Sequence, residues 1–328
     1  MTVRHNNTAA GLLAAIGVPR LLAPTTISTK SYIFFVSIRI YTLIYSLPEK
    51  EATRLKIRCL VVLVFLSMAA TLPSRAQSFL DDYFARVARN QAEQPHWVTP
   101  VATVTPRLEQ EFRYDIFWQG HADGTTTENY DGSKGLELIP ANNVEVIVNV
   151  PPYIVHNNPK QVDGWGDESF LVKYRFLSRN EESGNYILTA FLGWSIPTGT
   201  YKNGSLHAAI TPTLAFGKGW GPFDIQTTAG IGLPTGDSQK LGQPVTWNLT
   251  AQYRVLRKIW PELEMNSTFY HNGPNDGKQQ VFLTPGVVFG KFPLWRRLGL
   301  TVGTGVQIAA TRFHSYNHGW ILSTRLPF

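Results

Sequence analysis

The chain has 328 residues, 12% of them aromatic, and it contains a single cysteine. Its formal net charge of +7 is confined to residues 1–76, which carry nine Lys or Arg and two Asp or Glu, whereas residues 77–328 carry 21 of each kind. A nucleic-acid-binding protein needs a basic surface on its folded part, so this distribution excludes nucleic acid as the partner.

The basic N-terminal part is predicted to precede the folded domain. Residues 52–76 resemble a secretory signal peptide, with a basic start, an apolar run over 59–72 and small residues on both sides of Arg75. The run is too short for a comfortable membrane-spanning helix, and it holds the only cysteine, Cys59. The remaining N-terminal extension, residues 1–51, is explained either by a start site placed too far upstream or by an inner-membrane anchor.

Residues 77–107 are predicted to form a periplasmic helix followed by a linker. Leu80, Phe84 and Val87 recur at helical spacing, which indicates one short amphipathic helix. Two prolines within residues 100–106 then interrupt any regular element, so this part is expected to connect the helix to the next domain.

From residue 108 onward, apolar and polar side chains alternate. In residues 245–255, for example, Val, Trp, Leu, Ala, Tyr and Val alternate with Thr, Asn, Thr, Gln and Arg. One lipid-like face and one polar face are typical of a membrane barrel. The predicted fold is therefore all-β: a transmembrane antiparallel up-and-down β-barrel of about 12 strands over residues 108–328, with a short N-terminal helix. The predicted strands are 108–119, 133–139, 143–155, 166–178, 185–197, 206–217, 222–233, 244–257, 262–271, 279–291, 297–310 and 318–328.

The last strand carries the features of an assembly signal for the outer membrane. Trp320, Leu322, Leu326 and Phe328 share one face, and an aromatic residue ends the chain. If Phe328 lies at the periplasmic rim, the segments between strands fall into two sets. Periplasmic turns are then expected at 139–143, 178–185, 217–222, 257–262 and 291–297. Outer loops are expected at 120–132, 156–165, 198–205, 234–243, 272–278 and 311–317, and these are longer on average.

The opposite face of the strands is predicted to line the lumen. By strand parity the charged residues on this face are Glu109, Glu111, Arg113, Asp115, Glu145, Lys173, Arg175, Asp224, Arg254, Glu262, Glu264 and Arg297. Charges of both signs suit a selective channel lining. The alternative is that these groups pair across the barrel and plug it, as side chains fill small barrels.

Two sets of residues are similar to a known family. GWGDESFLVKYRF at 164–176 resembles the Gly-x-Gly-Asp…Lys-Tyr-Arg-Phe segment of the MetA-pathway of phenol degradation family. IPTG at 196–199 and LPTG at 233–236 resemble its recurrent Pro-x-Gly strand ends. The resemblance covers roughly residues 110–328. It implies an outer-membrane barrel that passes small, often apolar or aromatic compounds, and it assigns a transport role to no individual residue.

The expected function is therefore an outer-membrane channel or transporter for small solutes, with outer-membrane lipid and the barrel-assembly machinery as partners and without a cofactor. A closed structural or adhesive barrel is one alternative. An outer-membrane hydrolase is another, since Ser267 and His271 lie close in sequence on the lipid-facing parity, but no third catalytic residue accompanies them. His314 and His318 have a spacing that binds metal on a helix, yet they flank an outer loop, so no metal site is expected.

Overall fold

The structure, a computed structural model, describes residues 74–130 and 134–328. Residues 79–328 form one compact unit, and of the unit before it only residues 74–78, the start of helix α4, are described. The predicted extension (1–51) and all but the end of the predicted signal peptide (52–76) lie outside the described residues. Within these bounds, no helix is long and apolar enough to span a bilayer.

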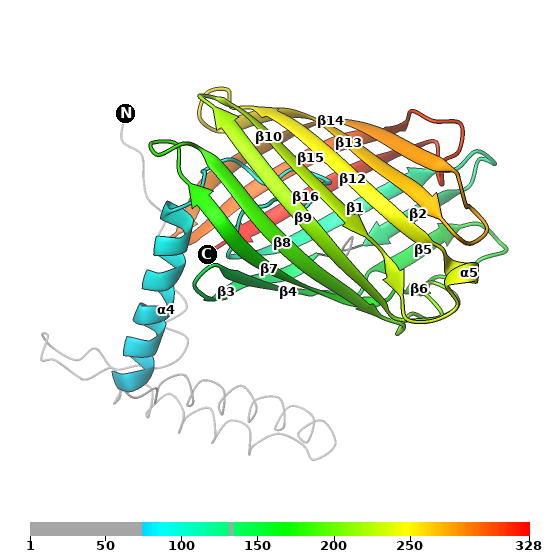
Figure 1. Ribbon diagram of the computed structural model, residues 1–328, viewed down its shortest axis with the longest axis horizontal. Coiled ribbons are helices and arrows are strands. Elements are labelled where there is room, and N and C mark those ends of the chain that lie inside the picture. The colour runs from blue at the N-terminus through cyan, green and yellow to red at the C-terminus, as the bar shows by residue number, and fades with distance from the viewer. Residues whose placement is uncertain (1–73, 131–133) are drawn as a thin grey trace, which may run out of the picture. The chain divides into compact units, whose positions relative to one another are not determined.

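Twelve antiparallel strands close into a barrel, as predicted (Figure 1). The first strand pairs with the last along their whole lengths, from Glu111 opposite Pro327 to Gly120 opposite His318. The strand segments are β1 (Glu111–Gly120), β2 (Thr126–Tyr130), β3 (Gly135–Ala141), β4 (Val144–Asn149), β5 (Tyr153–Asn157), β6 (Gly164–Trp165), β7 (Glu168–Arg179), β8 (Tyr186–Ile196), β9 (Ala209–Trp220), β10 (Phe223–Ile231), β11 (Leu233–Pro234), β12 (Gln243–Tyr253), β13 (Ile259–His271), β14 (Gln279–Trp295), β15 (Leu298–Ala309) and β16 (His318–Pro327). Four strands are interrupted and consist of the pairs β2/β3, β4/β5, β6/β7 and β10/β11.

The two faces of the wall differ as the sequence period requires. Along β16, for instance, Ile321, Ser323 and Arg325 point inward and are at most 1% exposed, whereas Trp320 points outward and is 47% exposed. Large apolar side chains such as Leu214 are exposed on the outer face of other strands as well. Such a continuous apolar exterior matches the lipid-facing belt of a transmembrane barrel.

Short turns join the strands at one end of the barrel and longer loops join them at the other, as the sequence predicts. The turns lie at 142–143, 180–185, 221–222, 254–258 and 296–297, and the loops lie at 121–125, 158–163, 197–208, 235–242, 272–278 and 310–317. Asn143, Gly221 and Arg296 have positive φ, which lets the chain reverse within a few residues. The loop at 235–242 holds the short helix α5 (Ser238–Leu241).

Some boundaries differ from the prediction. Residues 126–130 form β2 rather than part of an outer loop, because backbone pairing with β1 and β5 sustains a strand whose TTENY sequence lacks apolar alternation. At the other end, β9 continues to Trp220 and β14 to Trp295, so the turns that follow are tighter than expected.

Helix α4 (Ser74–Ala92) contains Leu80, Phe84 and Val87, whose spacing predicts the N-terminal helix, and begins within the predicted signal peptide (52–76). Its residue Val87 is 1% exposed and packs with Leu108 and Ile139 in a small apolar cluster. Asn90 Oδ1 accepts a hydrogen bond from the Asn143 N–H at 2.8 Å. The described part of α4 from residue 79 is thus fixed to the end of the barrel that carries the short turns.

Candidate functional site: the barrel lumen and its plug

Ten of the twelve predicted lumen residues are buried, with 0–7% of their surface exposed. They are Glu109, Glu111, Arg113, Asp115, Glu145, Lys173, Arg175, Asp224, Glu262 and Glu264. Nine of them lie on strands, on the face opposite the apolar exterior, so the strand period locates their charge correctly, whereas Glu109 precedes β1. Whether any of them contacts a passing solute stays a prediction.

Arg254 and Arg297 are exposed and lie in turns, not on strands. Strand β12 ends at Tyr253 because Leu256 and Arg257 take positive φ, and Arg297 follows Arg296, which also has positive φ. Arg297 lies over the ring of Phe84 in α4, 4.5 Å from its centroid. The prediction that these two residues lie on strands is wrong, although Arg254 still lines a pocket beside the plug.

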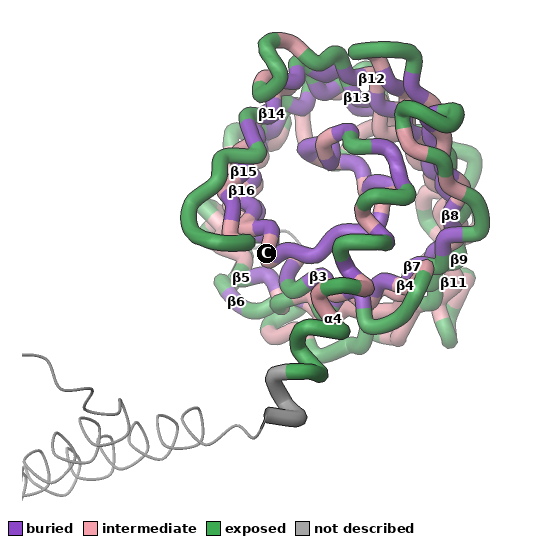
Figure 2. Tube along the Cα trace, turned by 90° about the vertical axis from the view of Figure 1, so that its left-hand side faces the viewer, coloured by how far each residue is buried: buried purple, intermediate pink, exposed green. Residues whose placement is uncertain are grey.

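Residues 94–108, called the plug from here on, fold into the barrel interior and do not form the predicted linker. A reciprocal pair of hydrogen bonds closes the base of this loop: Gln94 Nε2 donates to Leu108 O at 2.8 Å, and the Leu108 N–H donates to Gln94 Oε1 at 2.9 Å. In Figure 2 the plug is the largely buried tube that runs inside the ring of strands. The lumen is therefore occupied in part by the chain itself.

Two carboxylates on β13 bind the tip of the plug. Glu264 accepts hydrogen bonds from the backbone N–H groups of Ala102 and Thr103, both at 2.7 Å, and Glu262 accepts one from Val101 at 2.9 Å. A loop inside a barrel has no neighbouring strand to satisfy its backbone. These charge-assisted hydrogen bonds take the place of the hydrogen bonds that a neighbouring strand would make.

Cations on other strands bind the carbonyl groups of the plug. Arg113 Nη2 donates to Val101 O at 2.5 Å, and Arg325 donates to the carbonyls of Thr99 and, at 2.7 Å, Pro100. Further along, Lys173 Nζ donates to Arg107 O at 3.2 Å. Anionic wall residues thus accept hydrogen bonds from the N–H groups of the plug, and cationic wall residues donate hydrogen bonds to its carbonyl groups. This explains why both signs of charge occur on the inner face.

The plug also fits the wall by shape. An added Cβ at Gly217 would lie 2.4 Å from the Trp97 ring, and one at Gly219 would lie 2.7 Å from Trp97 Nε1. These two glycines of β9 leave a slot for the indole of the plug. Trp97 and Val101 belong to a buried apolar cluster with Ile187, Trp260, Val288 and Ile321 of the wall. Trp260 therefore turns inward, unlike the exposed Trp220 and Trp295 near other short turns.

Two ion pairs join charged residues of the inner face. Arg113 and Asp115 lie 2.9 Å apart, as do Lys173 and Glu145, and all four side chains are at most 1% exposed. A buried charge without an opposite partner is strongly unfavourable. These four side chains therefore compensate one another within the wall, whereas the buried Glu111 and Asp224 belong to no ion pair of the described residues.

Two further interior charges are not among the predicted lumen residues. Arg325 and Glu137 are 1% and 3% exposed. Their signal is present in the sequence, since Arg325 alternates with Leu326 and Glu137 lies between Leu136 and Leu138. Parity applied to every strand would have found both.

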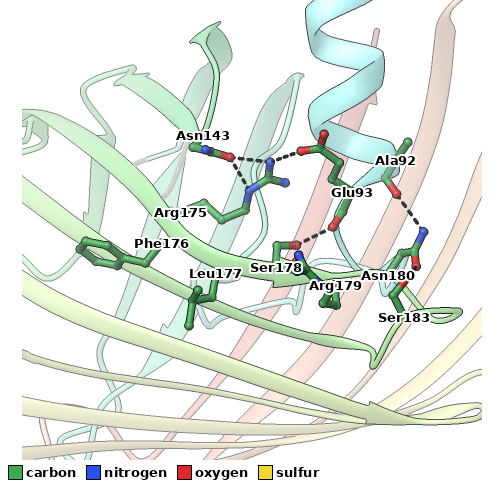
Figure 3. Close-up of a pocket in the computed structure, with 10 residues that line it drawn as sticks. All are labelled: Ala92, Glu93, Asn143, Arg175, Phe176, Leu177, Ser178, Arg179, Asn180 and Ser183. Carbon is green, nitrogen blue, oxygen red and sulfur yellow. Dashed lines mark hydrogen bonds and ion pairs between the residues drawn. The ribbon is translucent and has the colours of Figure 1, made fainter.

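Arg175 fastens α4 to the rim of the lumen (Figure 3). Its guanidinium donates to Asn143 Oδ1 at 2.6 Å and to Glu93 Oε2 at 3.1 Å, as Figure 3 shows. It also donates to the carbonyl of Asn90 in α4 at 2.7 Å. A groove of about 480 Å³ between the end of α4 and the turn after β7 is lined by Glu93, Asn143 and Arg175. Because its guanidinium binds the end of α4, Arg175 anchors the part of the chain that leads into the plug.

A second pocket, of about 300 Å³, opens beside the plug at the short-turn end. It is lined by plug residues 97–99 and by the basic side chains of Arg107, Arg254, Arg257, Lys291 and Arg325, with Glu109 and Glu111 as the acidic ones. None of the ion pairs among the described residues involves Arg254, Arg257 or Lys291. This entrance therefore carries an excess of positive charge.

The geometry supports neither a catalytic pair at Ser267 and His271 nor a metal site at His314 and His318. Ser267 and His271 lie on the outward parity of β13, and no hydrogen bond among the described residues joins them. His314 uses one ring nitrogen toward Thr311 O at 2.7 Å and the other toward Asn317 Oδ1 at 2.8 Å. In the described part of the chain, no group of three or more His, Cys, Asp or Glu residues could hold a metal ion.

Comparison with known proteins gives a family and several structures of related shape. A family model described as "Putative MetA-pathway of phenol degradation" matches residues 115–322. The chain is similar to an outer membrane channel from Pseudomonas putida F1, at 13% identity and a TM-score of 0.45 over 70% of this chain and 98% of that chain. It is also similar to the NanC porin, at 8% identity and a TM-score of 0.44 over 66% of this chain and 98% of that chain. No curated protein matches it.

Proposed function

The chain belongs to the MetA-pathway of phenol degradation family, whose model matches residues 115–322, and from this premise we propose that it is an outer-membrane channel for small solutes. The observation that carries the proposal is the plug. The carboxylates and cations of the wall bind the backbone of a separate loop, so the filling of the lumen is attached by hydrogen bonds and is not part of the sheet. Such bonds can be exchanged for bonds to water when the loop moves.

Small aromatic or apolar compounds are the proposed solutes. The name of the family supports a link to phenol degradation. The barrel itself contributes a narrow, partly filled interior, which favours small solutes over large ones. A closed barrel used only for structure would fill its lumen equally well, so transport has to be measured.

The proposal is tested by uptake of labelled phenol into cells that lack the chromosomal gene and carry either the full-length chain or an empty vector. We expect faster uptake with the chain, and the chain itself in the outer-membrane fraction after cell fractionation. Glycerol, a polar solute of similar mass, serves as the comparison. Equal phenol uptake in both strains would refute the transport proposal.

The barrel-assembly machinery is the proposed partner in biogenesis. Trp320, Leu322, Leu326 and Phe328 form the outward face of the last strand, and the Phe328 N–H donates to Gln110 O at 3.0 Å. We expect deletion of Phe328 to lower the fraction of barrel that resists SDS at room temperature, because the aromatic end of the strand is the recognised feature. Phe328→Tyr, which keeps an aromatic ring, is the control, and an unchanged folded fraction after deletion would contradict the assignment.

A further inference from the structure

The outer mouth of the barrel holds a tyrosine in a position that a free solute could occupy. Loop 310–317 joins β15 to β16 at the end opposite the short turns and turns Tyr316 toward the interior. The Tyr316 ring stacks on Phe282, with 4.3 Å between the ring centroids and 15° between the planes. Phe282 is an inward residue of β14 and is only 3% exposed. The phenol group of the chain thus lies flat on the wall of the lumen.

Polar side chains of the wall receive the hydroxyl group of this ring. Tyr316 Oη donates to Gln307 Oε1 at 2.6 Å, and Gln307 is 6% exposed on the inner face of β15. Burial raises the pKa of Tyr316 to about 12, against the effect of a hydrogen bond with Gln119. The ring therefore remains a neutral phenol with a buried partner for its hydroxyl group.

The wall leaves space for the ring at a glycine. An added Cβ at Gly319 would lie 3.3 Å from Tyr316 Cε2, tighter than an ordinary carbon contact. The site consists, then, of a flat aromatic floor at Phe282, a small edge at Gly319 and a hydrogen-bond acceptor at Gln307. Its three features match the flat faces, the ring edge and the hydroxyl group of a phenol.

We propose that this site binds a small hydroxylated aromatic solute, such as phenol, entering from the long-loop end, and that Tyr316 occupies the site in its absence. Only the loop segment has to move to vacate the site, because Phe282, Gln307 and Gly319 all belong to strands. The proposal rests on the proposed function, in which small aromatic compounds pass through the barrel, and it names the residues that recognise them.

The site is connected to the plug by polar side chains. Gln307 Nε2 donates to Asn266 Oδ1 at 3.5 Å, and Asn266 Nδ2 donates to Thr103 Oγ1 of the plug at 3.1 Å. A phenol bound in place of Tyr316 would use the same acceptor on Gln307. Gln307 and Asn266 therefore form a chain of hydrogen bonds between the solute site at the mouth and the plug.

Equilibrium binding of phenol to the detergent-solubilised, full-length protein tests the site without requiring transport. Tyr316→Ala empties the site, so we expect it to bind phenol about tenfold more tightly than the unmodified protein, which has to displace its own ring. Adding Gln307→Leu to Tyr316→Ala should remove about tenfold of that affinity, while toluene binding changes little, because toluene has no hydroxyl group. Phe313→Ala removes a loop aromatic that packs on Tyr270 instead, and it should not increase phenol binding.

Tyr316→Phe provides a milder variant, which keeps the stacked ring and loses only its hydrogen bond to Gln307; phenol affinity should rise above that of the unmodified protein here too. Equal phenol affinity in the unmodified protein, Tyr316→Phe and Tyr316→Ala would overturn the site, as would equal responses of phenol and toluene to Gln307→Leu. Phenol binding without phenol uptake in cells would refute transport and leave the site standing. Phenol uptake in cells without tighter phenol binding by Tyr316→Phe or Tyr316→Ala would refute the site and leave the transport proposal standing.

Discussion

Replacing residues 95–107 with Gly-Gly-Ser is expected to raise single-channel conductance several-fold in planar bilayers. The replacement removes the loop that occupies part of the lumen and leaves Gln94 and Leu108, which lie together at its base. Arg113, Arg325 and Glu264 lose their plug partners, and water that enters the lumen can hydrate them. The larger polar cross-section then carries more ions.

A synthetic peptide of residues 94–108 provides the control for this replacement. Added from the short-turn side, it should lower the conductance of the plugless barrel again, since Gly217, Gly219 and the charged wall still offer its contacts. The plugless protein should also unfold at a lower temperature, because Trp97 and Val101 no longer fill the apolar cluster. Identical conductance with and without the plug would show that current does not pass through this lumen.

Glu264→Gln is expected to loosen the plug without removing it. Its two carboxylate oxygens accept hydrogen bonds from the Ala102 and Thr103 N–H groups, and the amide offers one acceptor and places N–H donors against a backbone donor. A loss of about 2 kcal/mol in docking corresponds to a roughly 30-fold shift toward the undocked state. Amide hydrogen exchange at Ala102 and Thr103 should become faster by a similar factor.

Glu128→Gln is the matched control for that variant. Glu128 is a strand carboxylate of β2 that accepts a hydrogen bond from Tyr130, and no hydrogen bond or ion pair among the described residues joins it to the plug. Its substitution should leave exchange in the plug and channel opening unchanged. Unaltered exchange at Ala102 and Thr103 in Glu264→Gln would mean that the β13 carboxylates do not hold the plug.

Most strands could be predicted because they obey a local rule, which β2 does not follow. A wall residue contacts lipid on one side and the interior on the other, so a period of two places Asp115, Lys173 and Glu264 inside with no knowledge of their partners. The same rule fails where a strand ends. Arg254 keeps the inward parity of β12 but follows its last residue, Tyr253, and backbone φ at Leu256 and Arg257 sets that limit.

The plug could not be predicted from local sequence. Residues 94–108 contain no periodic pattern, and their partners lie up to 226 positions away, as in the hydrogen bond from Arg325 to Thr99 O. The charged wall residues bind mainly the backbone of the plug, and backbone groups carry no sequence signal. The glycines of β9 give the one visible hint, since Gly217 and Gly219 lie at alternate inward positions where a large side chain of another segment can fit.

We propose that the plug limits passage and moves to permit it, and a disulfide that ties the plug to the wall would hold it in place. An added Cβ at Gly303 would lie 3.0 Å from Val101 Cγ2, and that closeness suits a bridge between Val101→Cys and Gly303→Cys. With the bridge oxidised we expect low, steady conductance and slow phenol uptake, and after reduction we expect both to return to the level of the two single variants. Equal conductance and uptake in the oxidised and reduced states would contradict the account.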